Sequence, residues 1–233
     1  MPRSAPLSPD APTLTTRAHQ QLRRSIIEGR YPGGHRLRLD AVQKDLGLSS
    51  TPVREALIRL TSEGFVQLDD GRGFRVAPAT LEELADITRI RLILEKEAFA
   101  ESIEKGNDEW EAGVVASYQR LVAVERRSKD VIPSLGHDWS VRHSEFHTAL
   151  RAGCTSPGIL AICEAYFERS ERYRFISAVN RSRPSKKLSE HAKLMQLALD
   201  RKKAEALALM KAHIWETHQQ VLAALQDAKP RDC

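Results

Sequence analysis

The stretch "LDAVQKDLGLSSTPVREALIRLTSEG", residues 39–64, contains two apolar helical patterns separated by a glycine. Val53, Leu57 and Leu60 recur at helical spacing and form the inner stripe of the second pattern. Gly47 supplies the positive φ that a tight turn between two helices needs. Hydroxyl side chains follow this glycine and can cap the second helix. The stretch therefore predicts a helix-turn-helix.

The flanking sequence extends this prediction to a winged helix. A further amphipathic helix is expected over residues 15–28, ended by Gly29. On the other side, the alternating "GFVQLDDGRGFRVAP", residues 64–78, predicts a β-hairpin that turns at residues 69–73. In a helix-turn-helix the second helix enters the major groove with its N-terminal residues first, where an arginine can bind guanine or a phosphate. We expect the hairpin to be a wing that lies along the neighbouring groove.

Basic side chains concentrate in this N-terminal third of the chain. The first 78 residues hold twelve Lys and Arg against eight Asp and Glu, whereas all 233 residues together carry a formal net charge of +5. This distribution suggests a polyanionic partner, and we predict double-stranded DNA. The predicted DNA contacts are Arg38, Ser49, Ser50, Thr51, Arg54, Arg72, Gly73 and Arg75. The alternative is that Arg54 pairs with an acidic residue on a solvated helix face and that the hairpin is only structural.

Residues 14–78 also resemble the winged helix of the GntR family of bacterial transcription regulators. The most specific part of the resemblance is "TPVREAL…L…GFV…GRGFRV". It implies operator contacts by Thr51, Arg54 and Gly73. Many relatives carry an arginine where this chain has Ser50, and a basic residue in the preceding helix where it has Asp40. The resemblance therefore leaves the operator sequence open.

The C-terminal two-thirds of the chain predict helices only. Helical patterns cover residues 81–106, 108–129, 136–153, 156–179, 188–199 and 204–225. Short loops between such helices favour an antiparallel bundle. The fold class is therefore mostly α, with a winged helix at 14–78, a helical effector-binding and dimerisation domain at 79–226, and tails at 1–13 (disordered) and 227–233.

Composition excludes several other classes. Neither a membrane-spanning run nor a signal peptide is expected, because no apolar stretch is long enough and the start, "MPRSAPLSPDAPT", is rich in Pro and Ser. Cys154, Cys163 and Cys233 are too few and too widely spaced for a disulfide framework or a thiolate zinc site. We expect a cytoplasmic protein.

Four histidines share the inner faces of three predicted helices. His143 and His147 are four residues apart and lie on one apolar arc. His191 and His213 are each eleven residues from Lys202, so an antiparallel hairpin folded at 201–203 places them at the same level. Four buried imidazoles without partners would be costly, and one divalent cation would satisfy them together. We predict a metal site at His143, His147, His191 and His213, with zinc first and nickel or another ion as the alternative; core histidines bonded to neighbouring groups are the other interpretation.

The helical part resembles the FCD effector domain of the FadR branch of the GntR family. The matching residues are "R…LE" (Arg91, Leu94, Glu95), "FH..L" (Phe146, His147, Leu150), "EH" (Glu190, His191) and "M..H" (Met210, His213). The resemblance implies an all-helical dimer that binds a metal through an Asp or Asn and three histidines, and His143 occupies the Asp/Asn position here. It also implies that Arg91 faces a carboxylate effector; the alternative for Arg91 is a salt bridge with Glu95 or in the neighbourhood of Glu97.

The leading hypothesis is a homodimeric transcription regulator that binds a palindromic operator and senses a small organic acid at the metal site. Two alternatives stay open at this point. One is a metal-dependent enzyme in which the histidine site activates water, which would need a general base such as Glu190. The other is a regulator whose histidines are only structural.

Overall fold

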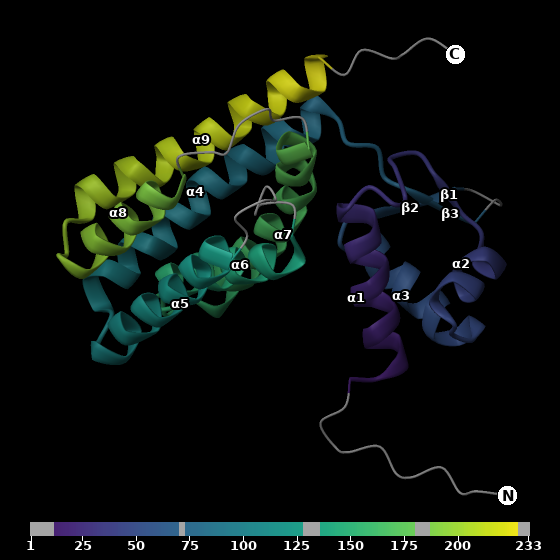
Figure 1. The fold of residues 1–233 in the computed structure, drawn as a ribbon, viewed down its shortest axis with the longest axis horizontal. Coiled ribbons are helices and arrows are strands. Elements are labelled where there is room, and N and C mark those ends of the chain that lie inside the picture. Colours follow the sequence, from purple (N-terminus) through teal and green to yellow (C-terminus); the bar gives the residue numbers. More distant parts are fainter. Residues whose placement is uncertain (1–11, 70–72, 128–135, 180–186, 228–233) are drawn as a thin grey trace, which may run out of the picture. The chain divides into compact units, whose positions relative to one another are not determined.

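The computed structural model describes residues 12–69, 73–127, 136–179 and 187–227 (Figure 1). The chain divides into two compact units between Pro78 and Ala79. The expected tails lie largely outside the described residues, as does the predicted DNA contact Arg72. Within the described ranges, no helix combines the length and the apolar character needed to cross a bilayer. The mostly helical fold class is confirmed.

The first unit is a winged helix. It holds α1 (Leu14–Ile27), β1 (Arg36–Leu37), α2 (Leu39–Leu46), α3 (Ser50–Ser62), β2 (Val66–Asp69) and β3 (Gly73–Val76). The Thr13 hydroxyl accepts a hydrogen bond from the Thr16 backbone N–H and caps α1. Gly47, with φ of 64°, ends α2 in the left-handed region, as the turn between α2 and α3 requires.

The small sheet has the order β1-β3-β2, and both pairs are antiparallel. The hairpin predicted from the sequence is β2 and β3, and the structure adds β1, in which Leu37 pairs with Phe74. One core joins the sheet to the helices. It contains Leu22 of α1, the predicted inner stripe of α3, and Phe74, all buried.

The second unit is a helical bundle. It holds α4 (Leu81–Lys105), α5 (Asp108–Arg127), α6 (His137–Arg151), α7 (Pro157–Val179), α8 (Lys187–Leu199) and α9 (Lys203–Asp227). Figure 1 shows α4 running alongside α9 and α5 alongside α6, and α4 also packs against α7. The turn between α8 and α9 contains Arg201, a non-glycine residue with φ of 58°.

The main hydrophobic core of the bundle is built from residues of α4, α5, α6, α8 and α9. Phe99, Phe146 and Leu194 are among the largest side chains that are fully buried in it. Polar residues nevertheless occupy part of the interior, because α6, α8 and α9 each direct histidines inward. Burying imidazoles among apolar side chains is expensive unless another group compensates them.

Candidate functional site

The N-terminal end of α3 presents polar side chains to solvent. Ser49, Ser50, Thr51 and Arg54 are all exposed, whereas Val53 on the opposite side is buried. The Ser49 side chain makes no capping hydrogen bond at the start of α3, so its hydroxyl is available to another acceptor or donor. In the part of the chain that is described, Arg54 has neither a hydrogen bond nor an ion pair. These residues have the polarity and exposure that contacts with a nucleic acid need.

The remaining predicted DNA contacts differ in their exposure and in their hydrogen bonds. Arg38 is exposed at the start of α2, and Gly73 is exposed at the start of β3 with φ of 96°. Arg75 is half-buried, and its guanidinium donates to the Gly34 carbonyl and to Asp69 Oδ2, both at 2.7 Å. Arg75 therefore holds the wing together in this structure.

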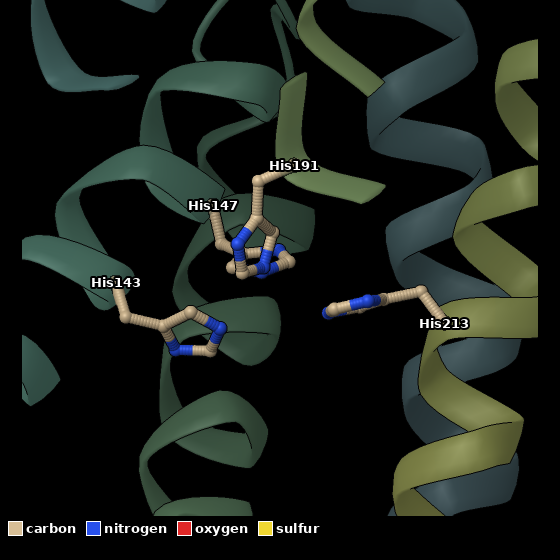
Figure 2. A group of neighbouring side chains, drawn as sticks. All are labelled: His143, His147, His191 and His213. Atoms are coloured by element: carbon tan, nitrogen blue, oxygen red, sulfur yellow. The ribbon is translucent and has the colours of Figure 1, made fainter. Parts of the chain in front are cut away.

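Four imidazoles meet inside the bundle (Figure 2). His143 and His147 come from α6, His191 from α8 and His213 from α9, and one ring nitrogen of each lies within 4.8 Å of the others. Ring centroids are 5.0 Å apart for His191 and His213, and 4.6 Å for His143 and His147. The hairpin of α8 and α9 thus brings its two histidines to the level of the α6 pair.

The cluster is shielded from water. All four histidine residues are at most 5% exposed. Burial lowers the pKa of His147 well below its ordinary value, and the three other imidazoles and Arg91 lower it further. His147 is therefore neutral near pH 7, which is the form that binds a metal ion. Neither of its ring nitrogens has a hydrogen-bond partner among the described residues.

Two carboxylates lie directly behind the imidazoles, a feature that the sequence analysis missed. His213 Nδ1 donates to Glu190 Oε2 at 2.9 Å, which leaves Nε2 for the centre of the cluster. Glu171 Oε1 is 3.8 Å from His143 Nδ1, and Glu171 also accepts two hydrogen bonds from Arg174. The sequence alone gives no sign of Glu171, whereas Glu190 was named in the resemblance to the FCD domain and as a possible base, but not as a partner of His213.

The donor set fits a divalent cation such as zinc. Four nitrogens around one tetrahedral ion at about 2.1 Å lie about 3.4 Å from each other, and small side-chain rotations close the remaining gap from the observed spacing. Both ring nitrogens of buried His147 lack a hydrogen-bond partner among the described residues, which independently indicates a bound group at this position. Neutral imidazoles suit zinc, nickel and copper better than magnesium or calcium.

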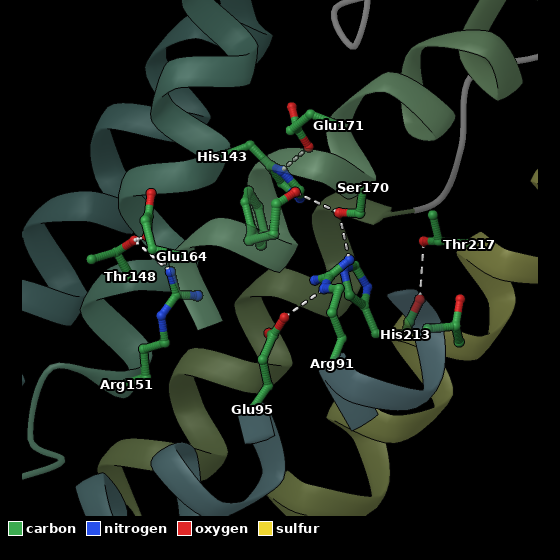
Figure 3. A network of polar contacts seen from close by, with 12 residues as sticks. Arg91, Glu95, His143, Thr148, Arg151, Glu164, Ser170, Glu171, His213 and Thr217 are labelled. Atoms are coloured by element: carbon green, nitrogen blue, oxygen red, sulfur yellow. Dashed lines mark hydrogen bonds and ion pairs between the residues drawn. The ribbon is translucent and has the colours of Figure 1, made fainter. Parts of the chain in front are cut away.

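Arg91 lies beside this cluster (Figure 3). Its Nε donates to Glu95 Oε1 at 2.6 Å, so the salt bridge considered from the sequence is present. Its Nη1 donates to Ser170 Oγ at 2.9 Å, and its Cζ lies 4.9 Å from the centre of the Phe167 ring. Among the described residues its Nη2 has no hydrogen-bond acceptor. Arg91 therefore retains a donor for a ligand while Glu95 holds it in position.

The other histidines serve elsewhere. His218 Nδ1 lies 3.0 Å from the Thr88 hydroxyl, and its ring stacks on Trp215. His137 is exposed at the start of α6. In the winged helix, His19 contacts the Glu63 carboxylate at 2.8 Å and His35 stacks on Tyr31. None of these four belongs to the cluster.

Family models match both units. The model described as "Bacterial regulatory proteins, gntR family" covers residues 14–76, and the FCD domain model covers residues 86–216. In the structural comparison, the chain is similar to McbR of Escherichia coli, with a TM-score of 0.72 at 21% identity over 94% of this chain and 100% of that protein.

Two regulators are similar in sequence over most of their length. BphR of Paraburkholderia xenovorans is 34% identical over 203 residues, which are 87% of this chain and 82% of BphR. The transcriptional repressor GlaR of Escherichia coli is 33% identical over 200 residues, 84% of this chain and 90% of GlaR. Their shared class excludes the metal-dependent enzyme considered above. The chain belongs to the GntR family of bacterial transcriptional regulators and carries an FCD domain.

Proposed function

We propose that this regulator binds a palindromic operator as a homodimer and that a small carboxylic acid, bound at a divalent metal ion, controls its affinity for DNA. The convergence of four buried imidazoles from three helices carries the proposal. The metal would be held by His143, His147, His191 and His213, with zinc as the first candidate. The winged helix, residues 14–78, would contact DNA, and residues 79–226 would bind the acid and dimerise. The protein would act in the cytoplasm, where the chromosome lies.

Electrostatics explains why such a centre would attract an acid. Neutral imidazoles contribute no charge, so the +2 charge of the ion would be reduced only by Glu190 behind His213 and by Glu171, which Arg174 already pairs, behind His143. Water is excluded from the cluster and screens this charge poorly. A carboxylate could then bind the ion and the free Nη2 of Arg91 together.

Metal content and acid binding test the proposal directly. We expect purified protein to hold one divalent ion per chain, measured by elemental analysis, and His147→Ala to lose it. Thermal-shift screening of carboxylic acids should give stabilisation that a chelator abolishes. Metal-free protein that responds normally to its acid would overturn the site, and the histidines would then be structural.

Footprinting tests the proposed assembly. Two recognition helices related by a dyad require half-sites related by the same dyad, so protection should be palindromic. Protection of a single asymmetric half-site would contradict the homodimer on DNA.

A further inference from the structure

A second buried arginine continues the row of histidines on α6. Arg151 follows His147 by four residues, as His147 follows His143, so the three side chains lie on one face of the helix. Arg151 is 3% exposed. No sequence motif assigns Arg151 a role, and neither the proposed metal site nor the Arg91 site uses it.

The guanidinium of Arg151 is only partly satisfied. Its Nη2 donates to the Thr148 hydroxyl at 3.1 Å and to Glu164 (Figure 3). Its Nη1 is buried and has no hydrogen-bond partner among the described residues. Glu164 is 41% exposed, so it pairs with Arg151 from the solvent side. A buried charged donor without an acceptor is costly, which points to an acceptor that binds from inside.

Arg151 and Arg91 converge on the same ring. The Cζ atom of Arg151 lies 5.6 Å from the centre of the Phe167 ring, and that of Arg91 lies 4.9 Å from it. The two Cζ atoms are therefore no further apart than the sum of these distances. His147 lies against the same ring, with centroids 5.2 Å apart. Phe167 is therefore a buried apolar ring that has two guanidinium groups over it and one edge of the histidine cluster beside it.

We propose that Arg151 is a second anion-binding residue of the effector site and that the effector is a dicarboxylate. The inference rests on the proposed function, in which one carboxylate binds the metal ion and Arg91. The second carboxylate would accept from Arg151 Nη1, and the short aliphatic chain between them would pack on Phe167. A monocarboxylate would leave Arg151 Nη1 unsatisfied and would bind more weakly.

Paired acids of equal chain length test the proposal on the zinc-loaded, full-length protein. Butanedioate, pentanedioate and hexanedioate are compared with butanoate, pentanoate and hexanoate by calorimetry. We expect the best diacid to bind at least about 10-fold more tightly than its monoacid, because it gains a charge-assisted hydrogen bond. Arg151→Met should remove this preference, weakening diacid binding by about 10- to 100-fold while leaving monoacid affinity and zinc content unchanged.

A control variant, together with the acid series measured on the wild-type protein, distinguishes failure of the Arg151 proposal from failure of the proposed function. Arg142→Met, also on α6, removes a more exposed arginine that bonds to Glu145 and should change neither series. Equal affinity for monoacids and diacids in the wild-type protein would overturn the dicarboxylate while leaving a metal-dependent acid sensor in place. A diacid preference that survives Arg151→Met would overturn the role of Arg151. Absence of zinc-dependent binding by any of the acids would overturn the proposed function as well.

Discussion

At the scale of single residues, Arg54 is the side chain of α3 that we expect to matter most for DNA. It is exposed one turn into the helix and makes neither a hydrogen bond nor an ion pair within the described part of the protein, so its guanidinium can bind a base or phosphate. Arg54→Ala should cost about 1–3 kcal/mol of operator binding. Fluorescence anisotropy with a labelled operator measures this loss.

The control for Arg54 lies on the same helix. Arg59 is at the other end of α3 and pairs with Glu63 at 3.0 Å, so Arg59→Ala should weaken operator binding much less. Equal losses for the two variants would mean that Arg54 contributes only general positive charge.

Glu190 is expected to tune the metal centre through His213. Its carboxylate accepts from His213 Nδ1 and so fixes the ring orientation and increases the basicity of Nε2. Glu190→Gln should reduce zinc affinity by about 10- to 100-fold, measured by competition with a chromophoric chelator. Glu216→Gln, which alters an exposed carboxylate on α9, provides the control. Unchanged zinc affinity in Glu190→Gln would leave Glu190 without a role at the metal.

At the scale of elements, the close approach of two helices depends on Gly153 after α6. A Cβ atom at Gly153 would lie 2.9 Å from Ser102 Cα of α4, and this contact is with backbone. Gly153→Ala should therefore lower the free energy of unfolding by about 1–3 kcal/mol, as overpacking does. Gly158→Ala meets nothing within 4 Å and should be neutral or slightly stabilising. Urea denaturation of both variants measures the difference, and equal stability would show that α4 can move aside.

Glycine residues made several helix ends predictable. The expected break at Gly106 matches the end of α4 at Lys105, and the helix expected between Gly136 and Gly153 is α6, His137–Arg151. The strand β1 was not predicted, because two residues cannot show an alternating pattern and their pairing depends on the folded wing.

The candidate site was predictable only where it follows helical periodicity. His143 and His147 are four residues apart, so a helix places them on one face. His191 and His213 are equally far from the turn between α8 and α9, so an antiparallel hairpin places them at the same level. The positions of Glu171 and Arg151 in the site could not be predicted from spacing, because each depends on a partner on another helix. Glu171 lies next to His143, and Arg151 lies over the Phe167 ring. Contacts of this kind need the tertiary structure.

At the scale of the whole molecule, α7 connects the proposed effector site with the start of the helical unit. Ser170 of α7 accepts from Arg91, and Tyr173 lies nearly one turn further along. The Tyr173 hydroxyl donates to Glu83 at 2.6 Å and accepts from the Thr80 backbone N–H at 3.1 Å. Thr80 is the N-cap of α4 and follows the segment that joins the two units. A shift of α7 on acid binding would therefore reach the joining segment through one hydroxyl.

Tyr173→Phe should separate acid binding from its effect on DNA. The ring keeps its packing and Glu83 keeps its hydrogen bond from Arg169, so a stability loss of only about 1 kcal/mol is expected. Zinc content and acid affinity should stay at wild-type values, because the hydroxyl touches neither. The change in operator affinity caused by the acid should shrink several-fold, measured by anisotropy titrations with and without acid. Tyr166→Phe is the matched control on α7, since the Tyr166 hydroxyl makes no hydrogen bond to a described residue. If Tyr173→Phe responds to the acid as fully as Tyr166→Phe does, the signal from the proposed effector site must instead pass along α4, the helix that carries Arg91 and that Thr80 caps.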